Sequence, residues 1–160
     1  MKLLRRIAVA VLVAGFAGPA AADTGDDLKK LLPKPIAGWK QGNVVALKVG
    51  KGFRAAGEYR PPSGSAVINV TYQTGAWDAE QKKKQLAAPD EAKKANIDVI
   101  EVGGRKWLAS VGKGGAGTVQ TLSTVLDNDV VVTVSGFGDD RKAHEAYAAA
   151  IDAAALGKVK

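Results

Sequence analysis

The sequence has no cysteine, a single histidine, and no methionine other than the initiator. Without cysteine the chain can form neither a disulfide bond nor a cysteine-linked lipid anchor, so a folded domain must be stable through packing alone. One histidine, His144, is too few for sites that need two or more imidazoles within one chain, such as common catalytic zinc and blue-copper centres. We therefore expect no metal site and no other cofactor.

Long hydrophobic runs are also missing. The apolar stretch 7–16 is too short to span a bilayer as a helix, and it follows a basic start and precedes the small residues Ala20 and Ala22. This order is typical of a secretory signal peptide, so residues 1–22 are predicted to be cleaved and the protein to be periplasmic. The alternative is a short membrane anchor that stays in place. No later stretch of the sequence is long enough to predict a transmembrane segment.

Basic residues outnumber acidic ones, but part of this excess belongs to the predicted signal. The formal charge is +7 for the whole chain. It falls to about +4 without residues 1–22, which contain three basic residues and no acidic one. This charge gives mild attraction to anionic surfaces and is far below that of a nucleic-acid-binding domain, so no nucleic-acid partner is expected.

In seven short segments apolar and polar residues alternate, and turn-forming residues bound each segment, as is typical of β-strands. Short glycine-, proline- or aspartate-rich connections separate most of them, which predicts antiparallel hairpins. The predicted strands are 43–49, 53–60, 65–73, 98–102, 105–113, 118–126 and 130–137. Trp107 alternates with Ala109 and is expected to point into the core.

Three segments are predicted to be helical. Residues 26–32 form a short helix ended by Pro33, residues 77–95 form a surface helix interrupted by Pro89, and one amphipathic helix runs from 139 to Gly157. The fold class is therefore α+β, with an antiparallel sheet of about six or seven strands and flanking helices. Residues 23–160 are expected to be a single domain.

Three patterns could carry chemistry, and each has a simpler structural interpretation. The string 112–117 matches G-x-G-x-x-G, but a strand follows it where a dinucleotide site needs a helix, so a hairpin loop is favoured. Ser135 with His144 could form a nucleophile and base, yet no G-x-S-x-G surrounds the serine. The carboxylate pairs Asp127/Asp129 and Asp139/Asp140 occupy expected turn and helix-start positions. No catalytic residue is predicted.

Binding residues are the better candidates. Trp39 and Trp77 lie at element boundaries, where they could border a groove. Lys82, Lys83 and Lys84 form a basic segment that could contact an anionic polymer, lipid headgroups or an acidic partner. Acidic residues are interleaved with these lysines, so a solvated helix face is the simpler interpretation.

The segment 28–39 contains Leu31-Leu32-Pro33, Ile36 and Gly38-Trp39. It resembles the start of a group of uncharacterised exported bacterial proteins, a resemblance that implies no activity. The order of elements is also similar to that of Mog1/PsbP-like domains. This similarity implies an antiparallel sheet between helices and a role as a binding or assembly accessory, with no functional residue carried over.

Three functions follow as hypotheses. The first is a non-enzymatic periplasmic accessory protein that binds an unknown protein partner or small ligand of the cell envelope. The second is a small envelope enzyme that uses carboxylates or Ser135 with His144. The third is an electrostatic binder of anionic envelope polymers or membrane surfaces.

Overall fold

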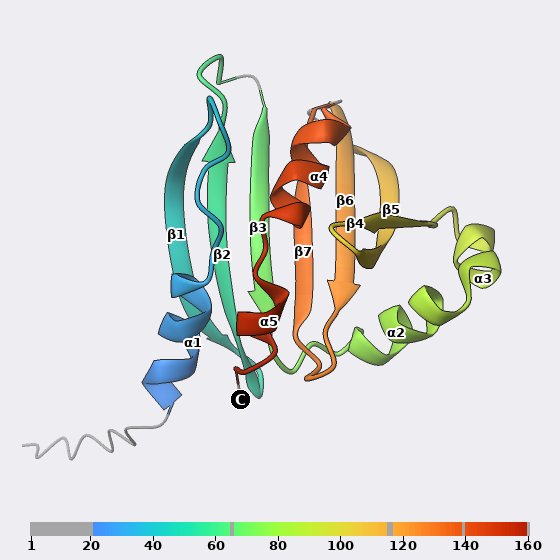
Figure 1. Cartoon of the computed structure of the whole chain (residues 1–160), viewed down its shortest axis with the longest axis horizontal. Coiled ribbons are helices and arrows are strands. Elements are labelled where there is room, and N and C mark those ends of the chain that lie inside the picture. The colour runs from blue at the N-terminus through green and yellow to red at the C-terminus, as the bar shows by residue number, and fades with distance from the viewer. Residues whose placement is uncertain (1–20, 65, 115–116, 139, 160) are drawn as a thin grey trace, which may run out of the picture.

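The protein folds around one antiparallel sheet of seven strands, in the order β1-β2-β3-β7-β6-β5-β4 (Figure 1). The computed structural model describes residues 21–64, 66–114, 117–138 and 140–159. Helices accompany the sheet, so the predicted α+β class and the antiparallel sheet are confirmed.

All seven predicted strands are present, with ends that differ by at most three residues. They are β1 (Lys40–Val49), β2 (Gly52–Arg60), β3 (Val67–Gln73), β4 (Asp98–Val102), β5 (Arg105–Gly114), β6 (Gly117–Val125) and β7 (Val131–Phe137). Each strand pairs with its neighbours in the chain, except where β3 pairs with β7. That one long-range pairing joins the first three strands and the last four in a single sheet.

Tight turns explain why neighbouring strands pair. Val49 pairs with Gly52 across the two residues Gly50 and Lys51, and Gly50 has the positive φ of 58° that the first position of such a turn requires. The glycine-rich string 112–117 lies in the β5–β6 hairpin, with Gly114 paired to Gly117. A strand follows the string, as expected.

One face of the sheet, here called the helical face, carries the main core. The helices α1 (Ala21–Lys30), α4 (Arg141–Ala149) and α5 (Ala153–Leu156) lie over this face in Figure 1. Their buried side chains pack on alternate residues of the strands, which confirms that Trp107 points into the core. The largest buried residues are Trp107, Tyr59, Tyr72, Tyr147, Leu28, Ile68 and Leu156.

The C-terminal helix is broken, contrary to the prediction of one helix from 139 to Gly157. Asp140 caps α4 by accepting a hydrogen bond from the Ala143 backbone N–H. The helix ends at Ala149, and Asp152 then caps α5 by accepting from Ala155. A second aspartate cap restarts the helix, which explains the break. Asp139 lies outside the described residues.

The N-terminal helix is longer than predicted, because α1 starts at Ala21 rather than at residue 26. The chain after α1 is held by two tyrosine hydroxyls. Tyr59 donates to the Pro33 carbonyl at 2.6 Å and Tyr72 donates to the Leu31 carbonyl at 3.0 Å. Of the predicted signal peptide 1–22, residues 1–20 lie outside the described residues.

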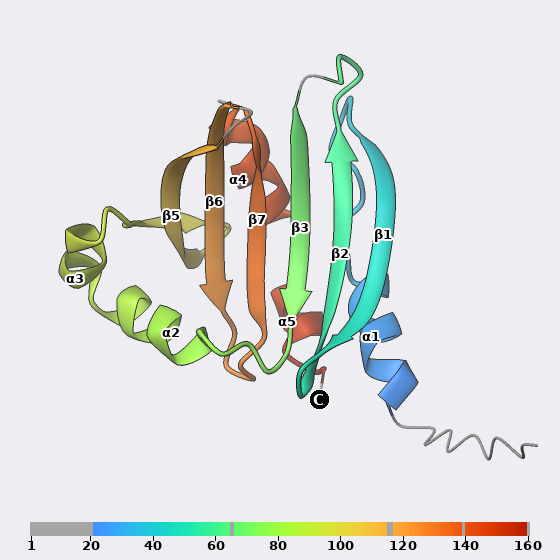
Figure 2. The same cartoon turned by 180° about the vertical axis from the view of Figure 1, so that it is seen from behind.

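The opposite face of the sheet, here called the open face, has much less cover (Figure 2). Only α2 (Ala79–Ala87) packs on it among the described residues, where Ala79 and Leu86 contact Val125 and Val131. The predicted interruption is confirmed, since α3 (Pro89–Lys94) begins at the proline. The described residues include no helix long and apolar enough to cross a membrane.

Candidate functional site

A groove of about 420 Å³ lies on the open face, between the ends of β1, β2, β3 and β7 and the start of α2. We call it the Trp77 groove. Its lining residues are Val49, Arg54, Thr71, Gln73, Ala76, Trp77, Asp78, Lys82, Val131 and Thr133. It therefore combines one large aromatic ring, two cationic side chains and several hydroxyl and amide groups.

Trp77 is the most exposed large hydrophobic residue on the described surface. It is 89% exposed, whereas Phe137, on the same face at the far end of β7, is 39% exposed. Trp77 immediately precedes Asp78, the residue at the start of α2, so the helix fixes the backbone that presents the indole. An indole this exposed contributes little to the core, so core packing does not explain why a tryptophan stands at this position.

The two cations of the groove are held by neighbours. Arg54 donates from Nε and Nη2 to the Oε1 atom of Gln73, at 3.0 and 2.6 Å, across the β2–β3 pair. Lys82 forms an ion pair with Asp78 at 2.9 Å, one helical turn away. Gln73 is neutral, so Arg54 keeps its full charge and its remaining N–H donors for a ligand.

The surface beside the groove is polar. The register places Asn69 opposite Ser135, and Ser135 opposite Thr121, in one row across the open face. The next row toward the groove contains Thr71 and Thr133. Short hydroxyl and amide side chains supply both hydrogen-bond donors and acceptors on this surface.

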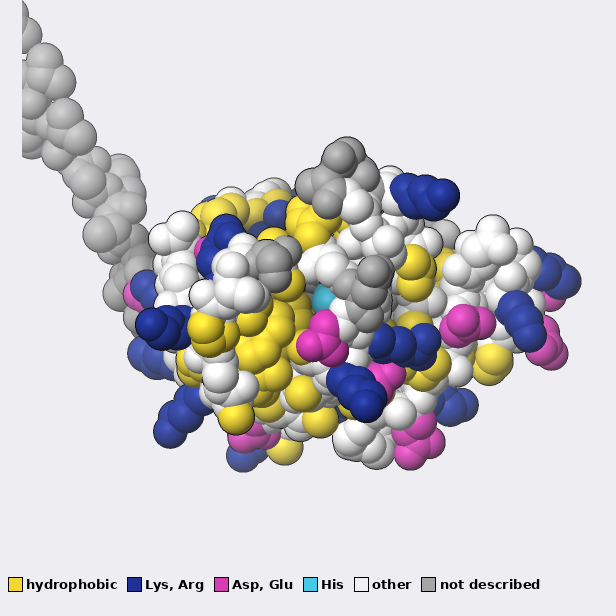
Figure 3. Space-filling model, turned by 90° about the horizontal axis from the view of Figure 1, so that it is seen from above, with side chains coloured by type: hydrophobic (Ala, Val, Ile, Leu, Met, Phe, Trp, Pro, Cys, Tyr) yellow, Lys and Arg dark blue, Asp and Glu magenta, His cyan; other side chains and the backbone are white. Residues whose placement is uncertain are grey.

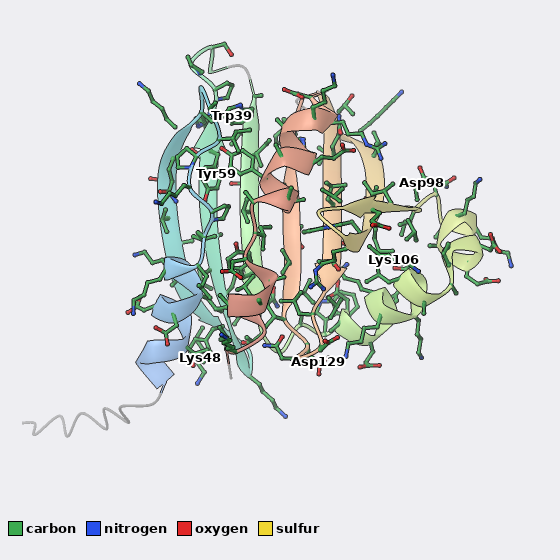
Figure 4. All side chains as sticks on the ribbon, viewed as in Figure 1. Trp39, Lys48, Tyr59, Asp98, Lys106 and Asp129 are labelled. Atoms are coloured by element: carbon green, nitrogen blue, oxygen red, sulfur yellow. The ribbon has the colours of Figure 1, made fainter. Side chains whose placement is uncertain are left out.

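The structure brings two of the predicted binding residues together and separates the others. Trp77 and Lys82 share the groove. Trp39 instead lies on the helical side, half-buried, with its ring 5.7 Å from that of Tyr147 (Figure 4). Trp39 and Trp77 therefore do not border one surface.

The two other predicted lysines contribute less to the groove. Lys83 pairs with Asp129 of the β6–β7 turn, and this hydrogen bond raises the pKa of Lys83. Lys84 is exposed. Figure 3 shows basic and acidic side chains interspersed at one end of the molecule, without a continuous basic field on that side.

Ser135 and His144 lie on opposite sides of the sheet. Ser135 belongs to the polar row of the open face, while α4 holds His144 in the core against the helical face. The His144 ring is buried, and its Nδ1 atom is 2.9 Å from the Asp140 carbonyl oxygen. The two side chains therefore do not meet.

The carboxylates also lie where local structure accounts for them. Asp127 and Asp129 are exposed in the β6–β7 turn, and Asp129 has a positive φ of 64°. Asp140 is the cap of α4. Among the described residues no group of three or more histidine, aspartate or glutamate side chains could hold a metal ion.

A second hollow lies on the helical face, where the β4–β5 turn meets α4 and the residues before α5. It has a volume of about 90 Å³, and Trp107, Leu126 and Val132 form part of its wall. Gly103 and Gly104 also line it. This space is too small for most metabolites, so the Trp77 groove is the stronger candidate site.

Sequence reasoning missed Arg54 and Gln73. Alternation in the second predicted strand places Arg54 on the wet face, but the partner across the hairpin depends on the β2–β3 register. That register could have been proposed by pairing polar residues across the loop 61–66.

No family model, curated protein or solved structure matches this chain in the three comparisons with known proteins. The resemblance to Mog1/PsbP-like domains stays a prediction, and the function must be argued from the site.

Proposed function

We propose that this chain is a non-enzymatic periplasmic binding protein whose ligand occupies the Trp77 groove. The ligand has a flat apolar part that stacks on the Trp77 indole and an anionic group that pairs with Arg54. The observation that carries the proposal is the 89% exposed indole beside the Arg54 guanidinium in one groove of about 420 Å³.

The energetics favour a ligand with both features. Covering half of an indole removes about 100 Å² of apolar surface from water, which contributes about 2.5 kcal/mol. A carboxylate or phosphate also gains charge-assisted hydrogen bonds from the Arg54 guanidinium, which Gln73 already orients. Pre-orientation reduces the entropy lost on binding.

The absence of convergent reactive groups in the described residues is the reason for preferring binding to catalysis. Arg54, Gln73, Lys82 and Asp78 line the groove, but Lys82 and Asp78 neutralise one another. Lys82 and Lys83 of α2 both pair with acidic side chains, which favours a local site over an extended electrostatic surface.

Native mass spectrometry of the protein purified gently from its own host tests the proposal. We expect a retained small-molecule mass that is lost in Trp77→Ala and Arg54→Gln and kept in Phe137→Ala. Phe137 is the matched control because it is an exposed aromatic on the same face outside the groove. A retained mass that survives both groove substitutions, or no retained mass in the unmodified protein, would contradict the proposal.

A further inference from the structure

The two edges of the sheet differ greatly in length. β4 has five residues, whereas β1 has ten and is the outermost strand in Figures 1 and 2. A strand edge presents N–H and C=O groups ready to pair with another strand, and a long apolar edge is the more reactive. The β1 edge is therefore the place where the sheet can be extended.

The pairing segment of β1 is short and well defined. The β1–β2 register shifts between Gln41 and Val44, so the longest unbroken register runs from Val44 to Val49. The hairpin turn closes on the pair Val49–Gly52, which directs the main-chain groups of Val49 and every second residue before it toward β2. The main-chain groups of Ala46 and its neighbours at i ± 2 then point outward.

Two exposed apolar side chains lie on this segment. Val45 and Leu47 are each 46% exposed and both lie on the open face. Between them is Ala46, whose main chain points outward. A two-fold axis through Ala46 would place Val45 directly opposite the partner's Leu47, and Leu47 opposite the partner's Val45.

We propose that two copies of this chain pair through β1 in antiparallel fashion, with Ala46 opposite the partner's Ala46. The two sheets then form one continuous sheet, with both open faces on the same side. The outward main-chain groups can form about six hydrogen bonds, and the valine–leucine pairs fall at the positions where cross-strand side chains are closest.

Charge and space are compatible with this register. The only charged residue in the pairing segment is Lys48, and the two-fold places it opposite the partner's Val44. The two Lys48 side chains are then about 13 Å apart along the strands, beyond the range of strong repulsion at physiological salt. On the helical face Val44 borders a hollow of about 540 Å³, which has room for the partner's Lys48 (Figure 4 labels Lys48 of this chain). Its charged lining residues are Asp26, Lys29 and Lys30, and Lys30 pairs with Asp27.

Charge substitutions at the two apolar positions test both the dimer and its register. We expect sedimentation equilibrium of the protein isolated from its host to give twice the chain mass. Val45→Lys with Leu47→Lys should raise the dissociation constant at least about tenfold, because like charges would face each other twice. Both sites are exposed, so the substituted chain should keep its circular dichroism spectrum and, at concentrations where the unmodified protein is also monomeric, its unfolding midpoint.

Val45→Glu with Leu47→Lys provides the decisive comparison. In the proposed register each glutamate faces a lysine of the other copy, so dimerisation should return. In a register with Leu47 opposite the partner's Leu47, the two substituted lysines would face each other and the chain would stay monomeric. Val111→Lys is the matched control, because Val111 is an exposed apolar residue of β5, away from this edge.

Three results would overturn the proposal: an unmodified protein that is monomeric over the whole concentration range, a dimer insensitive to the double lysine substitution, or no recovery with glutamate and lysine. Leu47 lies directly opposite Arg54 of the Trp77 groove, but sedimentation reads the mass of the assembly and native mass spectrometry reads the retained ligand, so the dimer and the proposed function can fail separately.

Discussion

Removing the hydroxyl of Tyr59 should destabilise the fold by about 1–3 kcal/mol. The side chain is fully buried, and its hydroxyl donates to the Pro33 carbonyl at 2.6 Å. Tyr59→Phe keeps the ring but removes the donor to the Pro33 carbonyl. Pro33 is buried, so its carbonyl oxygen is left unpaired. The penalty for an unpaired buried acceptor exceeds the net value of an ordinary hydrogen bond, which explains the size of the effect.

Urea unfolding followed by circular dichroism measures this loss. With an m-value of about 2 kcal/mol per molar, a loss of about 2 kcal/mol moves the midpoint by about 1 M. Gln41→Leu is the matched control. Gln41 is exposed and donates to the same hydroxyl at 3.3 Å, so this change should cost less than about 0.5 kcal/mol. A Tyr59→Phe protein within 0.5 kcal/mol of the unmodified one would refute the reasoning.

Other consequences concern pH, close packing and helix capping. Burial raises the pKa of Tyr59 from 10.0 to about 12, although the Gln41 hydrogen bond lowers it in part. The unfolded chain loses this proton near pH 10 and the folded chain near pH 12, so the contribution to stability is complete below pH 10 and decreases from pH 10 to 12. Alkaline titration of the unfolding free energy checks this, and a flat profile would contradict it. Gly136→Ala should destabilise by several kcal/mol, because a Cβ there would lie 2.0 Å from a main-chain oxygen of β3. Gly112→Ala, in open space, should change the thermal midpoint little, and equal effects at the two glycines would be the contrary result. Asp140→Ala should lower the free energy of unfolding in urea by about 1 kcal/mol, because α4 loses its cap. An unchanged free energy of unfolding would contradict this role of Asp140.

The strands could be predicted from sequence because their signals are local. Alternation of apolar and polar residues identifies the two faces of a strand, and glycine or aspartate marks the turns. The break before α5 was missed because residues 139–157 have continuous helical periodicity. Asp152 also fits the polar side of a continuous helix, so the pattern did not reveal it as the cap of α5.

The candidate site was predicted only in part. Trp77 and Lys82 line one groove, since both belong to the segment that begins α2, and their role in binding stays a prediction. Trp39 was placed with them because its position at an element boundary resembles that of Trp77. The sequence gives no information on which face of the sheet each boundary meets.

The sequence by itself determined the class of fold, the strands, the turns and the inward direction of Trp107, because these depend on residues close together in the chain. Only the tertiary structure decided that β3 pairs with β7, that α1, α4 and α5 gather on one face, and that Trp77 is left on the other. Pairing and helix docking depend on how much apolar surface distant segments bury together, and the local pattern does not contain that quantity.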